Sequence, residues 1–417
     1  MELTAEETDV LGGAHGAAAK FAMEIVTNYG RAMGASRLME ITRAHIDSCL
    51  FHGQSGLDFA ERLLYGGAQV RVPTTLNVGA VDLLHPELNR SDPASIESGR
   101  RLMSAYQSMG CRPTWTCAPY QLKDRPVFGE QIAWAESNAI VFVNSVLGAR
   151  TDRYGDFIDI CAAITGKVPE HGLHISENRR GEIVFDVSGL PASLSTSELL
   201  WPLLGLVVGR LTGNRIPVIV GAANNPDEDA LKAFGAAAAS SGAVALFHVV
   251  GVTPEAQTLD QALQGTRARE TILITASMLR EAQSELTSSQ TGRLVAVSVG
   301  TPHFSLQEFE RLIALIDGKR RDADVDFYVS AARETILQVE ERGWNRLLDD
   351  FGIDLVADTC TYLKPILRRT DGLVMTNSAK WAYYAPGNLG YDVVFATLDD
   401  CVASAVAGRV VLDTAYE

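Results

Sequence analysis

The sequence predicts an α/β protein with mainly parallel, doubly wound sheets and flanking helices. Short apolar runs typical of buried strands recur between residues 216 and 397, and helical stretches such as 228–241 and 305–318 separate most of them. Alternating buried strands and helices indicate βαβ units. With 417 residues, 47% hydrophobic and 21% charged, the chain is long enough for two or three globular domains.

The first part of the chain is the less regular one, and we predict an N-terminal lobe over residues 1–195. Thr4 and Glu7 form a capping box before an apolar pattern of helical spacing, which predicts a helix that includes the glycines of "GGAHG". "SRLMEI" predicts a short strand, and the following residues 42–56 show neither period, so we expect a functional loop there. Residues 57–67 return to a helix that ends on a glycine pair.

The second part is regular, and we predict a βαβ doubly wound lobe over residues 196–417. Ser195 and Glu198 are placed to cap a helix over 199–211. The strand-like runs that follow are 216–221, 243–251, 271–275, 293–300, 325–330, 353–359, 372–375 and 392–397.

Small polar residues follow three of these runs directly. They are Gly300-Thr301, Asp358-Thr359-Cys360 and Thr376-Asn377-Ser378. Ligands of open α/β sheets bind at the carboxyl ends of the strands. If the strands run parallel, these residues share one edge, and we expect the chemistry there.

Charge and composition exclude several classes of protein. The net charge is −15, which argues against a nucleic-acid backbone or an anionic membrane as partner. The acidic N-terminus lacks the apolar segment of a signal peptide, and no apolar stretch reaches a membrane-spanning length. We expect a cytoplasmic protein, whose six cysteines are free thiols or metal ligands rather than a disulfide framework.

The cysteines differ in their surroundings. Cys360 is either a small core residue or a ligand, and its position at a strand end favours the ligand. Cys117 lies in the loop "TWTCAPY", and Cys49 lies near His45 and Asp47 in an irregular stretch. Cys161 and Cys401 suit a helical core. The pattern contains no CxxC, and "HGLH" is a weak zinc signal.

Two further clusters suggest a polar site. Arg150 and Arg153 follow an apolar run and suit carboxylate or phosphate groups of a small substrate, although surface salt bridges would have the same pattern. "TNSAKWAYYAPG" combines the Ser378 hydroxyl and Lys380 with two tyrosines just after a predicted strand.

Seven stretches taken together resemble the large-subunit domain of the aconitase X family. They are "TTLNVGAVDL", "TCAPY", "NSVLGARTDR", "GLHISENR", "GTPHFSLQEF", "ADTC" and "TNSAKWAYYAPG". The matches run in order along almost the whole chain. The resemblance implies an aconitase-like architecture and an iron–sulfur hydro-lyase of small hydroxy acids.

The resemblance also implies a substrate and a cofactor. The loop "HIDSCLFHGQSG" is similar to the branch that dehydrates cis-3-hydroxy-L-proline to Δ1-pyrroline-2-carboxylate, and Thr301 stands where the mevalonate 5-phosphate branch typically has a cysteine. Loss of that ligand favours a [2Fe-2S] cluster held by Cys117 and Cys360, with Cys49 as third ligand. A separate small swivelling-domain subunit is expected as partner.

Roles for the remaining residues follow from position and resemblance. We expect Arg150 to hold the substrate carboxylate. Further substrate contacts are expected from Arg153, Ser145, Thr74 and Asn77. Ser378, with its pKa lowered by Lys380, is a candidate base unless the small subunit supplies one, and His45 is the candidate acid for the leaving hydroxide.

Three alternatives stay open at this point. One is a dehydratase of another small hydroxy acid such as mevalonate 5-phosphate. The second is a non-catalytic iron-responsive binding protein, and the third is a thiol or zinc hydrolase.

Overall fold

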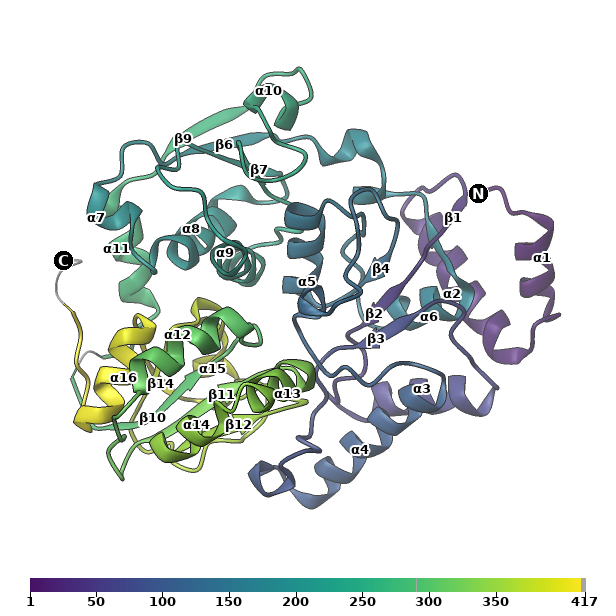
Figure 1. Ribbon diagram of the computed structural model, residues 1–417. Helices are drawn as coiled ribbons and strands as arrows, with labels where there is room; N and C mark the ends of the chain where they lie inside the picture. The colour runs from purple at the N-terminus through teal and green to yellow at the C-terminus, as the bar shows by residue number, and fades with distance from the viewer. Residues whose placement is uncertain (290, 414–417) are drawn as a thin grey trace. The chain divides into compact units, whose positions relative to one another are not determined.

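The computed structural model describes residues 1–289 and 291–413, which form two compact units (Figure 1). The first unit comprises residues 1–81 and 92–180, and the second comprises the described residues of 82–91 and 181–413. The second unit thus begins at Gly181 and includes a short segment from the N-terminal part of the chain. The division into two lobes, residues 1–195 and 196–417, that we predict from the sequence remains a proposal.

The first unit has short strands and a larger share of helix. β2 pairs in parallel with both β3 and β4, and β1 pairs antiparallel with β5. Its strands are β1 (Leu38–Glu40), β2 (Ala44–Ile46), β3 (Thr74–Leu76), β4 (Ala133–Trp134) and β5 (Lys167–Pro169). Its helices are α1 (Ala5–Gly12), α2 (Ala17–Ala32), α3 (Gln54–Tyr65), α4 (Pro93–Ser108), η2 (Pro119–Gln121), α5 (Ser137–Phe142), the π-helix η3 (Val143–Leu147), α6 (Ile158–Thr165), η4 (Gly172–His174) and η5 (Ser176–Arg179).

Two predictions for this unit were wrong. "GGAHG" does not lie inside one helix: Gly12 ends α1, and Gly13 and Gly16 lie between α1 and α2 with φ angles of 94° and 92°, which favour glycine. Residues 44–46, expected in a loop, form the central strand β2. The capping box of Thr4 and Glu7 is confirmed, as are β1 and α3.

The second unit contains two parallel sheets. The larger has the order β12-β11-β10-β13-β14, and the smaller has the order β8-β7-β6-β9. Its strands are β6 (Ile183–Asp186), β7 (Pro217–Val220), β8 (His248–Val249), β9 (Glu270–Leu273), β10 (Leu294–Val299), β11 (Asp326–Ser330), β12 (Ile353–Val356), β13 (Leu373–Thr376) and β14 (Asp392–Phe395). All neighbouring pairs in both sheets are parallel, which confirms the predicted α/β class.

Helices flank these strands, as the larger sheet in Figure 1 shows. They are η1 (Pro86–Leu88), α7 (Ala192–Ser195), α8 (Leu200–Thr212), α9 (Glu228–Ser241), α10 (Leu259–Ala262), α11 (Ala276–Glu285), α12 (Leu306–Ile316), α13 (Arg333–Glu341), α14 (Asn345–Phe351), α15 (Ala379–Leu389) and α16 (Leu398–Ala407). The predicted cap of α8 was wrong: Ser195 ends α7, and Leu199 precedes α8 without a side-chain cap. The side chain of Glu198 is therefore left for other contacts.

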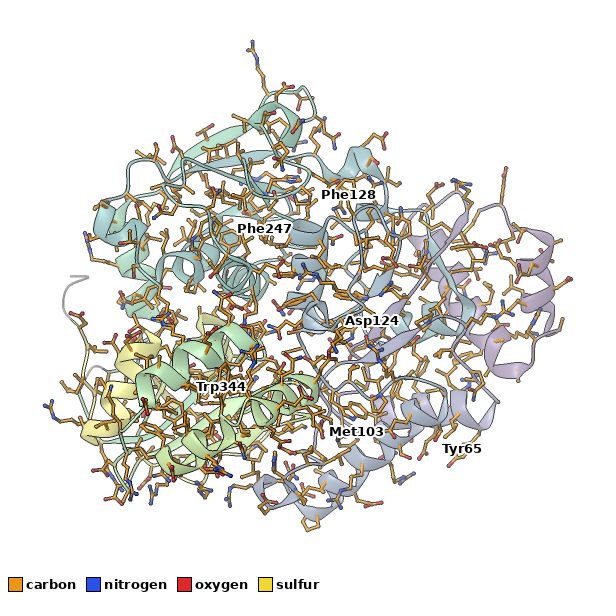
Figure 2. All side chains as sticks on the ribbon, in the orientation of Figure 1. Tyr65, Met103, Asp124, Phe128, Phe247 and Trp344 are labelled. Atoms are coloured by element: carbon orange, nitrogen blue, oxygen red, sulfur yellow. The ribbon has the colours of Figure 1, made fainter. Side chains whose placement is uncertain are left out.

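Burial on both faces explains why the strands of the larger sheet are continuously apolar. Every residue of β10 and β11 is buried, and Val297, Phe327 and Val329 belong to one apolar core with residues of the covering helices. Sheets covered on both faces need such continuous apolar strands. Figure 2 draws all described side chains; the labelled Phe247 is fully buried in the second unit, whereas Tyr65 of the first is 79% exposed.

Glycines allow α8 and α9 to pack closely. A Cβ atom on Gly205 would lie 2.3 Å from the carbonyl oxygen of Phe234, and one on Gly209 would lie 2.6 Å from that of Ala238. Real Cβ atoms do not approach that near. The two helices therefore depend on glycine at both positions. Among the described residues, no helix combines the length and apolar character needed to cross a membrane.

Candidate active site

Three strands of the larger sheet end at one edge, as the sequence predicted. β11 pairs in parallel with β10 and β12, and β13 pairs in parallel with β10. Thr301 follows β10, Cys360 follows β12, and Ser378 follows β13. The parallel register therefore brings polar side chains from three distant stretches to the same edge.

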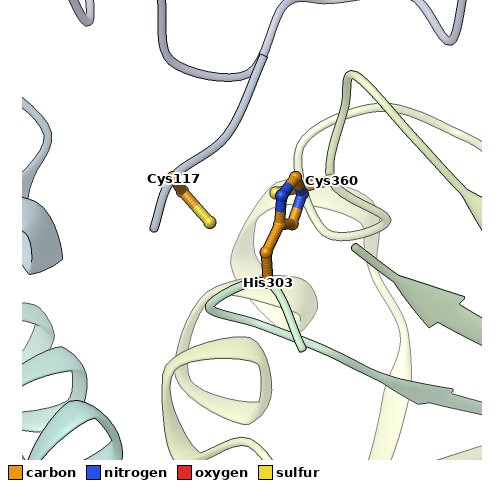
Figure 3. Close-up of side chains that lie close together, drawn as sticks. All are labelled: Cys117, His303 and Cys360. Carbon is orange, nitrogen blue, oxygen red and sulfur yellow. The ribbon is translucent and has the colours of Figure 1, made fainter. Parts of the chain in front are cut away.

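Cys360 and His303 form the pair of metal-ligand side chains at this edge (Figure 3). The Cys360 Sγ and a ring nitrogen of His303 lie within 4.8 Å of each other. Both side chains are buried, at 1% and 0% exposure. Burial lowers the pKa of His303 to about 4, so its imidazole is neutral, the form that binds metals.

Sequence reasoning missed His303. It lies three residues beyond the glycine that ends the β10 run, in the same "GTPHFS" stretch that drew attention to Thr301. A histidine in the short segment that follows a buried parallel strand was the signal that could have found it.

Three buried hydroxyls of the second unit have no hydrogen-bond partner among the described residues. They are the Oγ1 atoms of Thr301 and Thr359 and the Oγ atom of Ser330. Thr359 precedes Cys360, and Ser330 ends β11, beside the strand that carries Thr301. Buried polar atoms are nearly always satisfied, so this edge of the sheet has the donors and acceptors of a site that binds a further group.

Ser378 and Lys380 lie at the start of α15. The Ser378 hydroxyl donates to the Thr301 carbonyl oxygen and accepts a hydrogen bond from the Trp381 main-chain N–H at 3.0 Å. This is the geometry of a helix N-cap. The hydroxyl proton points to a carbonyl oxygen, which does not take up a proton.

A cavity of about 660 Å³ adjoins these residues in the second unit. Thr301, Ser378 and Lys380 line it together with Glu198, Lys232 and Arg311. Its walls also include the first turns of α9, α15 and α16 and residues 307 and 308 of α12. The predicted catalytic residues Ser378 and Lys380 thus share one cavity with Thr301.

A buried lysine, Lys232, is one of the residues that line this cavity. Lys232 is 2% exposed, and its ammonium group contacts Asp229 at 2.9 Å and the Glu308 carboxylate. Both carboxylates raise the pKa of Lys232 against the opposing effect of burial. Glu308 and Ser305 form the capping box of α12, so the ion pairs anchor the segment that carries His303.

The predicted residues of the first unit include a buried histidine. His45 lies on β2 at 0% exposure, and its Nδ1 is 2.8 Å from the Thr75 hydroxyl. Burial lowers the pKa of His45 to about 3. The ring is therefore neutral near neutral pH, which does not suit an imidazolium acid. Thr74, also on the neighbouring β3, donates to the Val72 carbonyl oxygen.

Asn77 and Cys49 of the first unit are neighbours. The Asn77 side-chain amide donates to Asp47, and its Oδ1 is buried without a partner among the described residues. The Cys49 thiol is 3.3 Å from the Ile46 carbonyl oxygen and 3.4 Å from that of Asn77. Burial raises the pKa of Cys49 well above its usual value, so these surroundings suit a protonated core thiol.

The remaining residues of the first unit lie around η3. Ser145 is buried on η3, and Arg153 is exposed. Arg150 Nη1 donates to the Ser176 hydroxyl at 2.7 Å, while its buried Nε has no partner among the described residues. Cys117 is 3% exposed in the segment before η2, and its carbonyl oxygen accepts a hydrogen bond from Asn138. Cys117 is the third side chain drawn in Figure 3.

Comparisons with known proteins match the predicted resemblance. Family models match three consecutive parts of the chain: "Aconitase X first domain" over residues 1–177, "Aconitase X second domain" over 181–284, and "Aconitase X third domain" over 294–407. Together these matches cover most of the sequence.

Named relatives are similar over nearly the full chain. A cis-3-hydroxy-L-proline dehydratase of Pseudomonas aeruginosa is 45% identical over 410 residues, which are 98% of this chain and 70% of that protein. A phosphomevalonate dehydratase large subunit of Methanosarcina mazei is 35% identical over 98% of both chains. The crystal structure of Thermococcus kodakaraensis aconitase X in its holo-form has a TM-score of 0.87 and 30% identity, and the match covers 97% of this chain and all of that one.

The fold, the family matches and the dehydratase relatives agree with one another. The doubly wound α/β architecture predicted from the sequence is that of an aconitase X structure. The chain therefore belongs to the aconitase X family and is a hydro-lyase.

Proposed function

We propose that this hydro-lyase dehydrates cis-3-hydroxy-L-proline to Δ1-pyrroline-2-carboxylate. The 45% identity to the Pseudomonas dehydratase exceeds the 35% identity to the Methanosarcina phosphomevalonate enzyme, and this difference supports the choice. The observation that carries the proposal is the buried pair of Cys360 and His303 at the carboxyl edge of the sheet.

The donor set of this pair fits an iron–sulfur group. Thiolates hold such clusters, and histidine replaces cysteine on some two-iron clusters. We propose that Cys360, His303 and Cys117 hold a [2Fe-2S] cluster. The hydrogen bonds and raised pKa of Cys49 suit a thiol, so His303 replaces Cys49 as third ligand in this proposal. When bound, the cluster supplies a Lewis acid that polarises the substrate hydroxyl.

The reaction makes specific demands on the polypeptide. In cis-3-hydroxy-L-proline the hydroxyl and the carboxylate share one ring face, so the Cα hydrogen lies anti to the hydroxyl. The hydrogen is weakly acidic, so a positioned base has to remove it. Elimination gives an enamine, which tautomerises to the product. The chain therefore has to orient the ring and neutralise the carboxylate.

Arg150 is our candidate for a carboxylate contact. Its Nη1 is held by Ser176 and its buried Nε has no partner among the described residues. A guanidinium with one edge fixed and one N–H available suits a carboxylate oxygen. We keep Arg153, Ser145, Thr74 and Asn77 as proposed substrate contacts.

The proposed base belongs to a small-subunit partner. Ser378 caps α15 and donates its proton to a carbonyl oxygen, and the neutral His45 is held by Thr75. A carbonyl oxygen does not take up the Ser378 proton, and a neutral His45 does not suit the acid role expected for it. The name of the Methanosarcina relative, a large subunit, supports a two-part enzyme, and a cytoplasmic location is part of the proposal.

The deciding experiment combines cofactor analysis with two assays. The chain is purified anaerobically, its iron, sulfide and zinc are measured, and turnover of cis-3-hydroxy-L-proline and mevalonate 5-phosphate is followed with the small subunit present. We expect iron and sulfide in equal amounts and turnover of the hydroxyproline. Zinc without iron would favour a hydrolase, and iron without turnover of either substrate would favour the iron-responsive binding protein.

A further inference from the structure

The cavity of the second unit is rich in carboxylates. Its lining includes seven acidic side chains and three cationic ones. The acidic ones are Glu198, Asp227, Asp229, Glu308, Asp399, Asp400 and Asp413, and the cationic ones are Lys232, Arg311 and Lys380. The cavity is thus unlike a phosphate site, where several arginines or lysines converge on the anion.

Two of the three cations each contact two carboxylates. Lys232 lies 2.9 Å from Asp229 and contacts Glu308. Arg311 lies 2.6 Å from Glu198 and contacts Asp399. A phosphate dianion would have to compete with two carboxylates for each of them. The third cation, Lys380, lies in the first turn of α15.

Among the helix N-termini that line the cavity, that of α15 has a positive charge that no acidic residue of its own first turn offsets. α9, α12 and α16 carry acidic residues in their first turns, whereas α15 has none there. The N-terminus of a helix carries a partial positive charge, and Lys380 adds to it. Beside it lies the Thr301 hydroxyl, which is without a partner among the described residues although Thr301 is 5% exposed. These groups suit a substrate carboxylate.

Glu198 lies next to the N-terminus of α15. Its Oε1 is 3.5 Å from the amide nitrogen of Asn377, the residue before Ser378, and 3.3 Å from the Leu398 main-chain nitrogen. Three of the six other acidic residues of the lining cap a helix: Asp227 caps α9, and Glu308 and Asp400 complete capping boxes. Glu198 is not the N-cap residue of any described helix, although its carboxylate accepts the Leu398 main-chain N–H at the start of α16 and pairs with Arg311. Its side chain is 23% exposed. A carboxylate with this access suits an ammonium group.

We infer that this cavity binds a zwitterionic imino acid, with the ring ammonium at Glu198 and the carboxylate at the first turn of α15, and that it disfavours phosphorylated hydroxy acids. The inference rests on the proposed function, because it assigns the substrate of that site to one chemical class. It makes Glu198 the residue that selects between the two substrates of the named relatives.

The test measures binding as well as turnover. The iron-loaded protein with its small subunit is titrated calorimetrically with L-proline, a zwitterion that lacks the leaving hydroxyl, and with mevalonate 5-phosphate. We expect L-proline to bind more tightly. A charged hydrogen bond contributes about 1.5–3 kcal/mol, so Glu198→Gln should weaken L-proline binding at least about tenfold, and Glu198→Asp should retain part of the affinity.

Asp227→Asn is the matched control. It also removes one negative charge from the lining, but asparagine caps helices as well as aspartate does, so L-proline affinity should stay within about twofold of wild type. Visible absorption and iron content of all variants show whether the metal centre is intact.

The outcomes separate this inference from the proposed function. Tighter binding of mevalonate 5-phosphate than of L-proline, or equal loss of L-proline affinity in Glu198→Gln and Asp227→Asn, would overturn the inference even if hydroxyproline is turned over. Selective L-proline binding that depends on Glu198, without turnover of hydroxyproline, would support the inference and refute the proposed function.

Discussion

Arg333 clamps the carboxylate of Asp358 with two parallel hydrogen bonds. Its Nε and Nη2 atoms lie 2.6 Å and 2.5 Å from the two carboxylate oxygens. Asp358 has a φ angle of 61°, a conformation that costs a non-glycine residue on the order of 1–3 kcal/mol. The clamp holds this turn in place two residues before Cys360. We therefore expect this contact to position the segment that carries Cys360.

We predict that Arg333→Lys lowers iron retention several-fold while the protein stays folded. Lysine keeps the charge but cannot form the paired hydrogen bonds. Iron per chain and the visible spectrum measure the effect. Arg368→Lys is the control, because Arg368 also contacts two carboxylates, Asp326 and Asp354, on strands of the same sheet. An equal loss of iron in both variants would contradict a positioning role for Arg333.

Cys360→Ser should abolish both visible absorbance and dehydratase activity, because a serine hydroxyl is a poor ligand for iron–sulfur clusters. Circular dichroism should stay that of the wild type. Cys401→Ala is the matched control: it also removes a buried thiol of the second unit, but from the apolar core. It should cost about 1 kcal/mol of stability and leave the iron content unchanged. Retained turnover in Cys360→Ser would refute the ligand role.

Gly205→Ala should lower the free energy of unfolding by about 1–3 kcal/mol, since the added methyl group would overlap the Phe234 carbonyl oxygen in the contact between α8 and α9. Gly56→Ala makes the same change inside α3, where a Cβ atom would meet nothing within 4 Å. That substitution should stabilise the protein by about 0.5–1 kcal/mol. Urea unfolding of both variants measures the two effects, and a stable Gly205→Ala would show that the helices can move apart.

Two carboxyl groups of the first unit, those of the buried Asp159 and the partly buried Asp47, predict a pH dependence of stability. Burial raises the pKa of Asp47 to about 8 and that of Asp159 to about 6. A raised pKa means that the folded state binds the proton more tightly than the unfolded state. The contribution of these two groups to the free energy of unfolding is therefore fully present below about pH 4. It is lost as the pH rises to about 6 for Asp159 and to about 8 for Asp47.

Asp47→Asn should flatten the fall in unfolding free energy between pH 6 and pH 8, because asparagine has no proton to lose and can still accept the hydrogen bond from Asn77. Asp92→Asn serves as control: hydrogen bonds from Ser95 lower the pKa of this exposed cap of α4, so its substitution should leave the slope above pH 6 unchanged. Urea unfolding at several pH values measures both, and an unaltered slope in Asp47→Asn would contradict the raised pKa.

The sequence alone determined the parallel architecture and the edge at which Thr301, Cys360 and Ser378 meet. Continuous apolar strands alternating with helices have few other ways to bury themselves. In the first unit the same reasoning failed at β2, a three-residue strand within a stretch, residues 42–56, that shows neither the helical nor the strand period. The five-residue π-helix η3 lies within one mainly apolar run and had no sequence signal of its own.

Only the tertiary structure decided the roles of the single polar residues. His303 joins Cys360 because two crossover connections bring the ends of β10 and β12 to one edge. Glu198 contacts Arg311 and Asn377, residues 113 and 179 positions further along the chain. Local sequence specifies burial and turn chemistry over a few neighbouring residues, whereas a site is assembled from contacts between distant ones, and these contacts depend on how the packed elements fit together.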